Sequence, residues 1–256
     1  MKLKNVINNE HYTIYNGSML DMLEIIEPNS IDLLVTDPPY LFVKGGMKSK
    51  RINVGKYEAS SEINTKMADF DENKIYEFLN AVKPKMKVMN AYIFCSKLQL
   101  VSYLKWSQEN KLNYDLLVWD KMKNGMISTK FFASNIEYIV RIYGSGCGLN
   151  KILNEDGKGD SSYYQKIQSC KQTKHSGHEA EKPIELLEKF VLLSSNEGDV
   201  ILDTFMGSGS TGIASLNCGR KFIGVELDEN YFKIASERMN YALNKYEYDI
   251  LIEKKK

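Results

Sequence analysis

The sequence predicts an α/β fold in which a parallel sheet is covered by helices on both faces. Short apolar, β-branched or aromatic runs alternate with longer segments of helical periodicity, the order typical of a parallel sheet. The length of 256 residues fits one large domain or a domain with an insertion, and 43% hydrophobic with 26% charged residues excludes a disordered chain. No apolar run approaches the roughly 18 residues that a membrane span needs, so we expect a cytoplasmic protein.

Seven strands and six helices are expected. The expected strands are His11–Asn16, Ile31–Thr36, Ala91–Cys95, Tyr114–Trp119, Ile136–Ile142, Val200–Asp203 and Lys221–Glu226. The expected helices are Met19–Ile26, Asn73–Met89, Lys97–Asn110, Pro183–Ser194, Ser210–Asn217 and Glu229–Leu243. Pro183 suits a first helical position, and the apolar residues after it recur at spacings of three and four. Two stretches, 43–69 and 143–181, resist assignment, and inserts of that length are usually functional or mobile.

The strongest local motif is Asp37-Pro38-Pro39-Tyr40, which follows the apolar run ending at Thr36. It therefore lies at the carboxyl end of a predicted strand, the edge of an α/β sheet where ligands bind. The two prolines rigidify the backbone and remove two N–H donors. What remains is rich in acceptors, because the Asp37 carboxylate and the Pro38 carbonyl can both accept from an amino group. The Tyr40 ring is available to stack, although a Pro-Pro turn that merely closes a strand is the simpler alternative.

A second motif lies between the strand Val200–Asp203 and the helix Ser210–Asn217. Its glycines, Gly207, Gly209 and Gly212, would let backbone N–H groups approach a ligand at a helix N-terminus. The Gly-x-Gly-x-x-Gly spacing alone is weak and equally suggests a nicotinamide dinucleotide site. The next predicted strand ends on Glu226, the position of an acid that accepts hydrogen bonds from ribose hydroxyls; a surface carboxylate is the alternative.

Together these motifs resemble the DNA amino-methyltransferases that use S-adenosylmethionine, in the group whose catalytic motif precedes its cofactor motif. The resemblance covers nearly the whole chain: Asp37–Tyr40, a variable region, His178-x-x-x-Lys182-Pro183, Asp203-x-Phe205-x-Gly207-x-Gly209 and the segment 219–228. It implies a Rossmann-like seven-stranded methyltransferase sheet with a circularly permuted motif order and an inserted target-recognition region. Residues 1–142 would form the catalytic half, 143–177 the target-recognition region and 178–256 the cofactor-binding half of one compact domain.

The resemblance also implies roles for individual residues. Asp37, Pro38, Pro39 and Tyr40 would be catalytic and would act on a base flipped out of double-stranded DNA. The cofactor S-adenosylmethionine would be bound by Asp37, Lys182, Pro183, Asp203, Phe205, Gly207, Ser208, Gly209, Ser210, Thr211 and Glu226. The segments Trp119–Lys121 and Asn135–Tyr138 resemble later family strands near the base pocket, and Trp119 equally fits a core position. A cognate restriction endonuclease and a homodimer are further candidate partners.

The expected DNA contacts come from the distribution of charge, because the net charge is only +1. Residues 41–66 carry six cations and two anions and begin directly after Tyr40. Because this segment adjoins the site of the flipped base, its cations would meet phosphates; a solvated surface loop is the alternative. The expected DNA-binding residues are Lys44, Lys48, Lys50, Arg51, Lys56, Lys171 and Lys174.

Asp37 as the first residue of its motif goes, by resemblance, with adenine N6, whereas members that methylate cytosine N4 more often carry serine. The expected activity is therefore site-specific methylation of adenine N6, with cytosine N4 as the alternative. A nicotinamide-dependent oxidoreductase would share the glycine turn but gives no reason for Asp37–Tyr40, and a noncatalytic DNA-binding module would need no cofactor pocket. No metal site is expected, because the spacing of Cys170, His175 and His178 fits no common ligand pattern.

Overall fold

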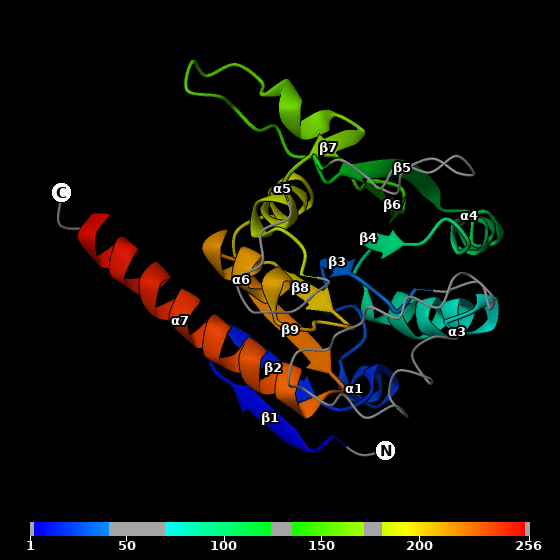
Figure 1. The fold of residues 1–256 in the computed structure, drawn as a ribbon, viewed down its shortest axis with the longest axis horizontal. Helices are drawn as coiled ribbons and strands as arrows, with labels where there is room; N and C mark the ends of the chain where they lie inside the picture. The colour runs from blue at the N-terminus through cyan, green and yellow to red at the C-terminus, as the bar shows by residue number, and fades with distance from the viewer. Residues whose placement is uncertain (1–2, 41–69, 124–134, 172–180, 254–256) are drawn as a thin grey trace.

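The computed structural model describes residues 3–40, 70–123, 135–171 and 181–253. They form a sheet of nine strands in the order β1-β2-β9-β8-β3-β4-β6-β5-β7, with helices against both of its faces (Figure 1). The strands are β1 (Asn5–Asn8), β2 (Tyr12–Asn16), β3 (Leu33–Thr36), β4 (Asn90–Cys95), β5 (Asn113–Asp120), β6 (Ile136–Tyr143), β7 (Ile167–Ser169), β8 (Val200–Asp203) and β9 (Lys221–Glu226). The helices are α1 (Met19–Ile25), α3 (Glu72–Val82), α4 (Leu100–Glu109), α5 (Ile184–Ser194), α6 (Ser210–Asn217) and α7 (Glu229–Glu253), with short 3-10 turns η1 (Lys83–Lys85) and η2 (Ser161–Tyr164).

All seven expected strands are present, and the expected number is wrong by two. β1 pairs antiparallel with β2 at one edge of the sheet. β7 pairs parallel with β5 at the other edge and lies inside the stretch that resisted assignment. Both strands are short, four and three residues, and β1 is largely exposed. Short edge strands carry little of the apolar alternation by which a strand is found in a sequence.

The strand order reverses direction between β3 and β8, and we call the place outside the carboxyl ends of these two strands the β3–β8 crevice. These neighbours are parallel, with Leu33 opposite Ile201. The chain leaves β3 toward β4 on one side, through α3, and leaves β8 toward β9 on the other side, through α6. In open α/β sheets ligands bind outside the carboxyl ends of the strands where the connections diverge in this way. Both predicted motifs, after β3 and after β8, therefore meet at one place.

The core consists of two layers, one on each face of the sheet. Helices α5, α6 and α7 cover one face and helices α1, α3 and α4 the other (Figure 1). Adjacent residues of β4 serve both layers, since Tyr92 packs in the first cluster and Ile93 in the second, as the alternation of side chains along a strand requires. The Tyr92 ring stacks on Phe190 of α5 with centroids 4.5 Å apart.

Several helix boundaries differ from the prediction, most of them by one to three residues. The helix expected over Asn73–Met89 ends at Val82, because Pro84 cannot continue the hydrogen-bond ladder, and η1 follows. Pro183 caps α5 in an extended conformation and is not its first helical residue. α7 continues ten residues past the expected end at Leu243. None of the helices in the described ranges is long and apolar enough to cross a membrane.

Candidate active site

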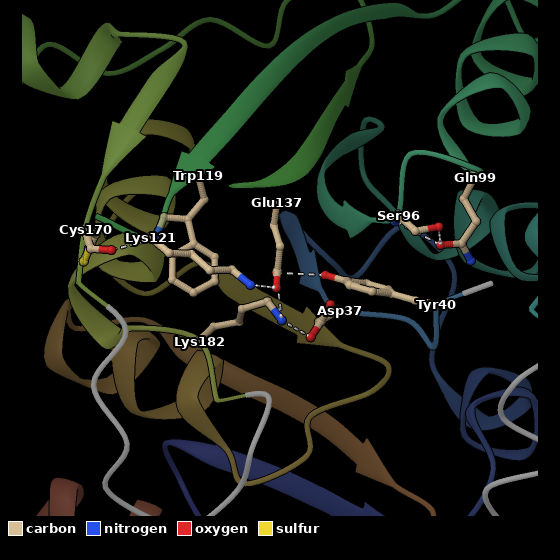
Figure 2. A network of polar contacts seen from close by, with 9 residues as sticks. All are labelled: Asp37, Tyr40, Ser96, Gln99, Trp119, Lys121, Glu137, Cys170 and Lys182. Atoms are coloured by element: carbon tan, nitrogen blue, oxygen red, sulfur yellow. Dashed lines mark hydrogen bonds and ion pairs between the residues drawn. The ribbon is translucent and has the colours of Figure 1, made fainter. Parts of the chain in front are cut away.

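Asp37 lies directly after β3, at the edge of the crevice, and its two carboxylate oxygens differ. Oδ2 forms an ion pair with the ammonium of Lys182, which lies two residues before α5 (Figure 2). Oδ1 is buried and has no hydrogen-bond partner among the described atoms. An unpaired buried acceptor carries a free-energy cost of about 1–3 kcal/mol, so such an oxygen is a candidate for contact with a ligand.

Tyr40 is joined to the same group of side chains through Glu137 of β6. Its hydroxyl donates a hydrogen bond of 2.9 Å to Glu137 Oε2. The Lys182 ammonium lies 3.4 Å from that same oxygen and 5.7 Å from the centroid of the Tyr40 ring. Tyr40 is thus fixed at its hydroxyl, while its ring stays beside the lysine.

Lys121, at the end of β5, completes the group. Its ammonium lies 2.5 Å from Glu137 Oε1 and 5.2 Å from the centroid of the Trp119 ring. Trp119 itself is fully buried and donates from Nε1 to the Cys170 carbonyl at 2.8 Å, so it belongs to the core, as the alternative interpretation held. Figure 2 shows Lys182 and Lys121 converging on the Glu137 carboxylate.

Two carboxylates and two ammonium groups therefore share a poorly hydrated site. Burial raises the pKa of Asp37, and the nearby Lys182 ammonium opposes this shift. Burial also acts to raise the pKa of Glu137, but Lys182 and Lys121 outweigh it and the pKa is lowered. Burial acts to lower the pKa of Lys182, and the two carboxylates outweigh it, so that pKa is raised. The four charges compensate one another.

Gln99 is a site residue that the sequence analysis missed. Its side-chain amide donates to the carbonyls of Pro39 and Phe70, each at 2.9 Å. Its Oε1 accepts from the backbone N–H and the hydroxyl of Ser96. Ser96-x-x-Gln99 ahead of α4 is the spacing of a capping box, the one sequence signal that marked this residue. The Gln99 amide thus links Pro39 and Phe70, which lie on either side of the segment 41–69.

The cofactor motif after β8 is tied to the catalytic motif by short polar contacts. The Thr36 hydroxyl donates to Asp203 Oδ1 at 2.8 Å, and the Phe205 N–H donates to the same oxygen at 3.0 Å. Burial raises the pKa of Asp203 to about 6, although the Thr211 hydroxyl and these donors oppose the shift. The Phe205 ring packs edge-on against Phe70, with centroids 5.5 Å apart. Asp203 therefore holds the ends of β3 and β8 together.

Glu226 ends β9, and its carboxylate accepts two backbone hydrogen bonds. Gly207 N–H donates to Oε2 and Asp228 N–H to Oε1, each at 2.8 Å. Burial raises the pKa of Glu226 to about 7, more than these two donors lower it. The Asn16 side chain donates to the Glu226 carbonyl at 2.9 Å, and its own Oδ1 is buried without a partner among the described atoms.

The glycine turn is held largely by contacts within the protein. Gly207 N–H donates to Glu226, and Gly209 N–H donates to the Met206 carbonyl at 2.8 Å. Both N–H groups therefore already have an acceptor within the protein. Gly209 has a φ of +82°, which favours glycine. The Ser208 carbonyl and hydroxyl both accept from Arg238 of α7, at 2.7 and 2.9 Å. The Ser210 hydroxyl is buried, with no partner among the described residues.

Most of the predicted DNA-binding residues cannot be placed. Lys44, Lys48, Lys50, Arg51, Lys56 and Lys174 lie outside the described residues. Lys171 is described and is exposed, two residues past β7. Of the cluster considered for a metal, His175 and His178 also lie outside the described ranges; within those ranges no three His, Cys, Asp or Glu side chains are grouped to bind a metal ion.

The chain is similar to curated methyltransferases over most of its length. It is 29% identical over 248 residues to the type II methyltransferase M2.LlaDCHI of Lactococcus lactis subsp. cremoris, covering 90% of both chains. It is 25% identical over 261 residues to the DNA adenine methyltransferase YhdJ of Escherichia coli, covering 91% of this chain and 84% of that one.

Two solved structures have the same fold. The M1.HpyAVI–SAM complex superposes with a TM-score of 0.65 at 22% identity, covering 90% of this chain and 99% of the other. The cytosine-N4-specific PvuII DNA methyltransferase superposes with a TM-score of 0.64 at 16% identity, covering 93% of both. The model of the DNA methylase family matches residues 31–237, which include Asp37, Glu137, Lys182 and Glu226. The chain therefore belongs to the DNA methylase family.

Proposed function

We propose that the protein transfers a methyl group from S-adenosylmethionine to the exocyclic N6 of adenine in double-stranded DNA, after the base is flipped out of the duplex. The observation that carries this proposal is that Oδ1 of Asp37, at the edge of the β3–β8 crevice, is buried and has no partner in the described part of the chain. A base amine needs an acceptor at such a place, and Glu226 and the glycine turn lie at the same edge of the sheet.

The chemistry follows from the electronic structure of the amine. Its lone pair is delocalised into the ring, so the amine is a poor nucleophile. Asp37 Oδ1 and the Pro38 carbonyl, by accepting the two amino hydrogens, localise that lone pair and stabilise the positive charge that develops on nitrogen. When bound, S-adenosylmethionine supplies an already activated methyl group. Tyr40, fixed by Glu137, provides the ring on which the flipped base stacks.

The residues around the crevice fit this cofactor. A carboxylate that accepts from the ribose hydroxyls is expected at the end of the second cofactor strand, which is where Glu226 lies. The Asn16 Oδ1 and the Ser210 hydroxyl are buried polar groups without partners in the described part of the chain, and each is adjacent to this region. Asp203, Phe205, Ser208 and Thr211 act here mainly through contacts within the protein.

Adenine is favoured over cytosine by Asp37 and by the relative YhdJ, which is a DNA adenine methyltransferase. The likeness to the cytosine-N4-specific PvuII enzyme is at 16% identity and concerns the fold alone. The membership of the DNA methylase family argues against the nicotinamide-dependent alternative.

The product identifies the target atom. DNA incubated with the purified protein and S-adenosylmethionine would be digested to nucleosides and separated by mass. We expect N6-methyladenine; N4-methylcytosine in its place would overturn the choice of base. The absence of any methylated nucleoside, under conditions where calorimetry detects cofactor binding, would overturn the proposed reaction.

The remaining partners and the division of the chain stay predictions. Residues 143–177 are the proposed target-recognition region, between a catalytic half at 1–142 and a cofactor-binding half at 178–256. A restriction endonuclease that cleaves the unmethylated site would be the natural functional partner, since M2.LlaDCHI bears the name of a type II methyltransferase. The homodimer and the cytoplasmic location likewise rest on the sequence.

A further inference from the structure

Lys182, which was predicted to bind the cofactor, lies between two carboxylates of the site. Its side chain is 8% exposed, and its ammonium contacts Asp37 Oδ2 and lies 3.4 Å from Glu137 Oε2 (Figure 2). It comes from the segment before α5, whereas Glu137 comes from β6. Three parts of the chain far apart in sequence therefore meet at this ammonium.

The contact with Lys182 determines where the other oxygen of Asp37 lies. A carboxylate is planar, so fixing Oδ2 leaves only limited rotation for Oδ1. Oδ1 is buried, has no partner within the described ranges, and is the acceptor that the proposed reaction uses. A misplaced acceptor loses most of its effect, because transition-state stabilisation depends on geometry within fractions of an ångström.

Glu137 performs a corresponding role for Tyr40. Its Oε2 accepts from the Tyr40 hydroxyl at 2.9 Å, and its Oε1 binds Lys121 at 2.5 Å. Lys121 thereby anchors the carboxylate from the far side. Glu137 thus connects the side chain proposed to stack on the base with the lysine that holds Asp37.

We propose that Lys182 and Glu137 are positioning residues for methyl transfer: Lys182 orients the Asp37 carboxylate, and Glu137 holds both Lys182 and the Tyr40 hydroxyl in place. This inference rests on the proposed function, which it deepens by assigning the two residues a part in the chemical step. It also moves Lys182 from cofactor binding to the side of the target base.

The two residues act on Asp37 with opposite electrostatic sign. Lys182 stabilises the Asp37 carboxylate, whereas the negative Glu137 destabilises it. Among the residues that the structure describes, the other titratable groups around Asp37 are Tyr40, Cys95 of β4, Tyr103 of α4, Asp203 of β8 and, through Glu137, Lys121 of β5. Burial raises the pKa of Cys95 and Tyr103 far above neutrality, so both stay neutral.

The test measures single-turnover methyl transfer against pH in two variants. The active form needs an ionised Asp37, so the rate falls on the acid side as Asp37 is protonated. Lys182→Met removes the stabilising cation, and we expect a rate at least about tenfold lower, with the acid limb moved up by roughly one pH unit or more. Glu137→Gln keeps an acceptor for Tyr40 but removes the negative charge, so we expect the acid limb to move down. S-adenosylmethionine affinity should stay within about threefold of the wild-type value in both.

Matched controls separate positioning from general loss of charge. Lys105→Met and Glu72→Gln remove the partners of an exposed ion pair between α4 and α3 and should leave the rate and the acid limb unchanged. Lys182→Arg keeps the cation, and we expect its acid limb to remain at the wild-type pH, which keeps the proposal testable if Lys182→Met folds poorly.

The positioning role would be overturned if the acid limb moved in the same direction in Lys182→Met and in Glu137→Gln. It would also be overturned if Lys182→Met lost as much cofactor affinity as it lost rate. A wild-type protein that methylates no DNA would instead overturn the proposed function itself.

Discussion

The two oxygens of the Asp37 carboxylate have different proposed roles: Oδ2 forms an ion pair with Lys182, and Oδ1, which has no partner among the described atoms, is the proposed acceptor for the base amine. Asp37→Ala removes the acceptor, and we expect methyl transfer to fall by about 100-fold or more. Lys182 keeps Glu137 as a partner in this variant, so the fold and the cofactor affinity should be nearly unchanged. Calorimetry with S-adenosylmethionine beside single-turnover rates would measure both, and an equal loss in the two would contradict the assignment.

Glu226 gives the cofactor site a dependence on pH. Its pKa is raised to about 7 by burial, so a large fraction of the groups are protonated near neutrality. Ribose hydroxyls donate to the ionised form, so binding favours deprotonation and the affinity should rise with pH. Between pH 6 and pH 8 we expect the affinity for S-adenosylmethionine to increase by up to about tenfold. The measurement is calorimetry across this range.

Glu226→Gln is the control for that dependence. It should bind S-adenosylmethionine more weakly and with a nearly flat profile, because the amide does not titrate. A slope that survives in this variant would belong to other groups, among them Asp203 with its pKa of about 6.

Individual residues of the candidate site could be predicted from the sequence where they belong to a contiguous motif. Asp37–Tyr40 and the glycine turn could be found because each is one short run after an apolar strand. The bond from Tyr40 to Glu137 spans 97 positions and depends on which strand lies beside β4. No local pattern carries that information, so only the resemblance places Glu137 and Lys121 near the base pocket. The contact of Lys182 with Asp37 could not be predicted from the sequence.

At the scale of elements, the turn before α6 depends on Gly209 for two separate reasons. Its φ of +82° disfavours other residues, and an added Cβ would lie 3.0 Å from the Cβ of Ala235 in α7. The left-handed conformation alone costs a non-glycine residue about 1–2 kcal/mol. We therefore expect Gly209→Ala to lower the free energy of unfolding by more than this amount, because α6 and α7 must also separate slightly.

Gly157 supplies a matched control for that prediction. Its φ is +71°, and an added Cβ would meet nothing within 4 Å. Gly157→Ala should therefore show the conformational cost without the packing cost. Urea unfolding of both variants measures the difference, and equal losses would mean that the contact with Ala235 does not matter.

Helices and strands could be predicted from the sequence where the hydrophobic pattern agrees with the residues that end an element. The strands of the middle of the sheet are short runs of buried residues, and all were found. The end of α3 is set by Pro84, a signal present in the sequence but outweighed there by the apolar periodicity that continues to Met89. β7 has only three residues and is defined by its pairing with β5, so the pattern of its own three residues could not identify it.

For the molecule as a whole, the order of the strands matters more than the order of the motifs. The catalytic motif comes early in the sequence and the cofactor motif late, yet β3 and β8 are neighbours. The Thr36 hydroxyl joins their ends through Asp203. A permuted sequence therefore produces one crevice, because the parallel pairing aligns the carboxyl ends of strands that are more than 160 residues apart.

The ends of the segment 41–69 are both anchored at this crevice. Gln99 binds the carbonyls of Pro39 and Phe70, and the Phe70 ring packs on Phe205 of the cofactor motif. Six cations lie between these anchors in the sequence. A basic segment connected at both ends to the proposed site of base flipping is suited to contact the phosphates around the flipped nucleotide.

Neutralising Lys48, Lys50 and Arg51 together with Gln should therefore weaken DNA binding for all sequences. The slope of log affinity against log salt should become shallower by up to about 2.7, three phosphate contacts' worth, with cofactor affinity unchanged. The control replaces Lys87, Lys111 and Lys221 with Gln. These exposed lysines lie at the amino ends of strands, on the opposite edge of the sheet, so the same loss of charge should leave the salt slope unchanged. Fluorescence titrations at several salt concentrations measure both slopes. If the two triple variants change the slope equally, net charge alone governs the affinity and the segment does not contact DNA.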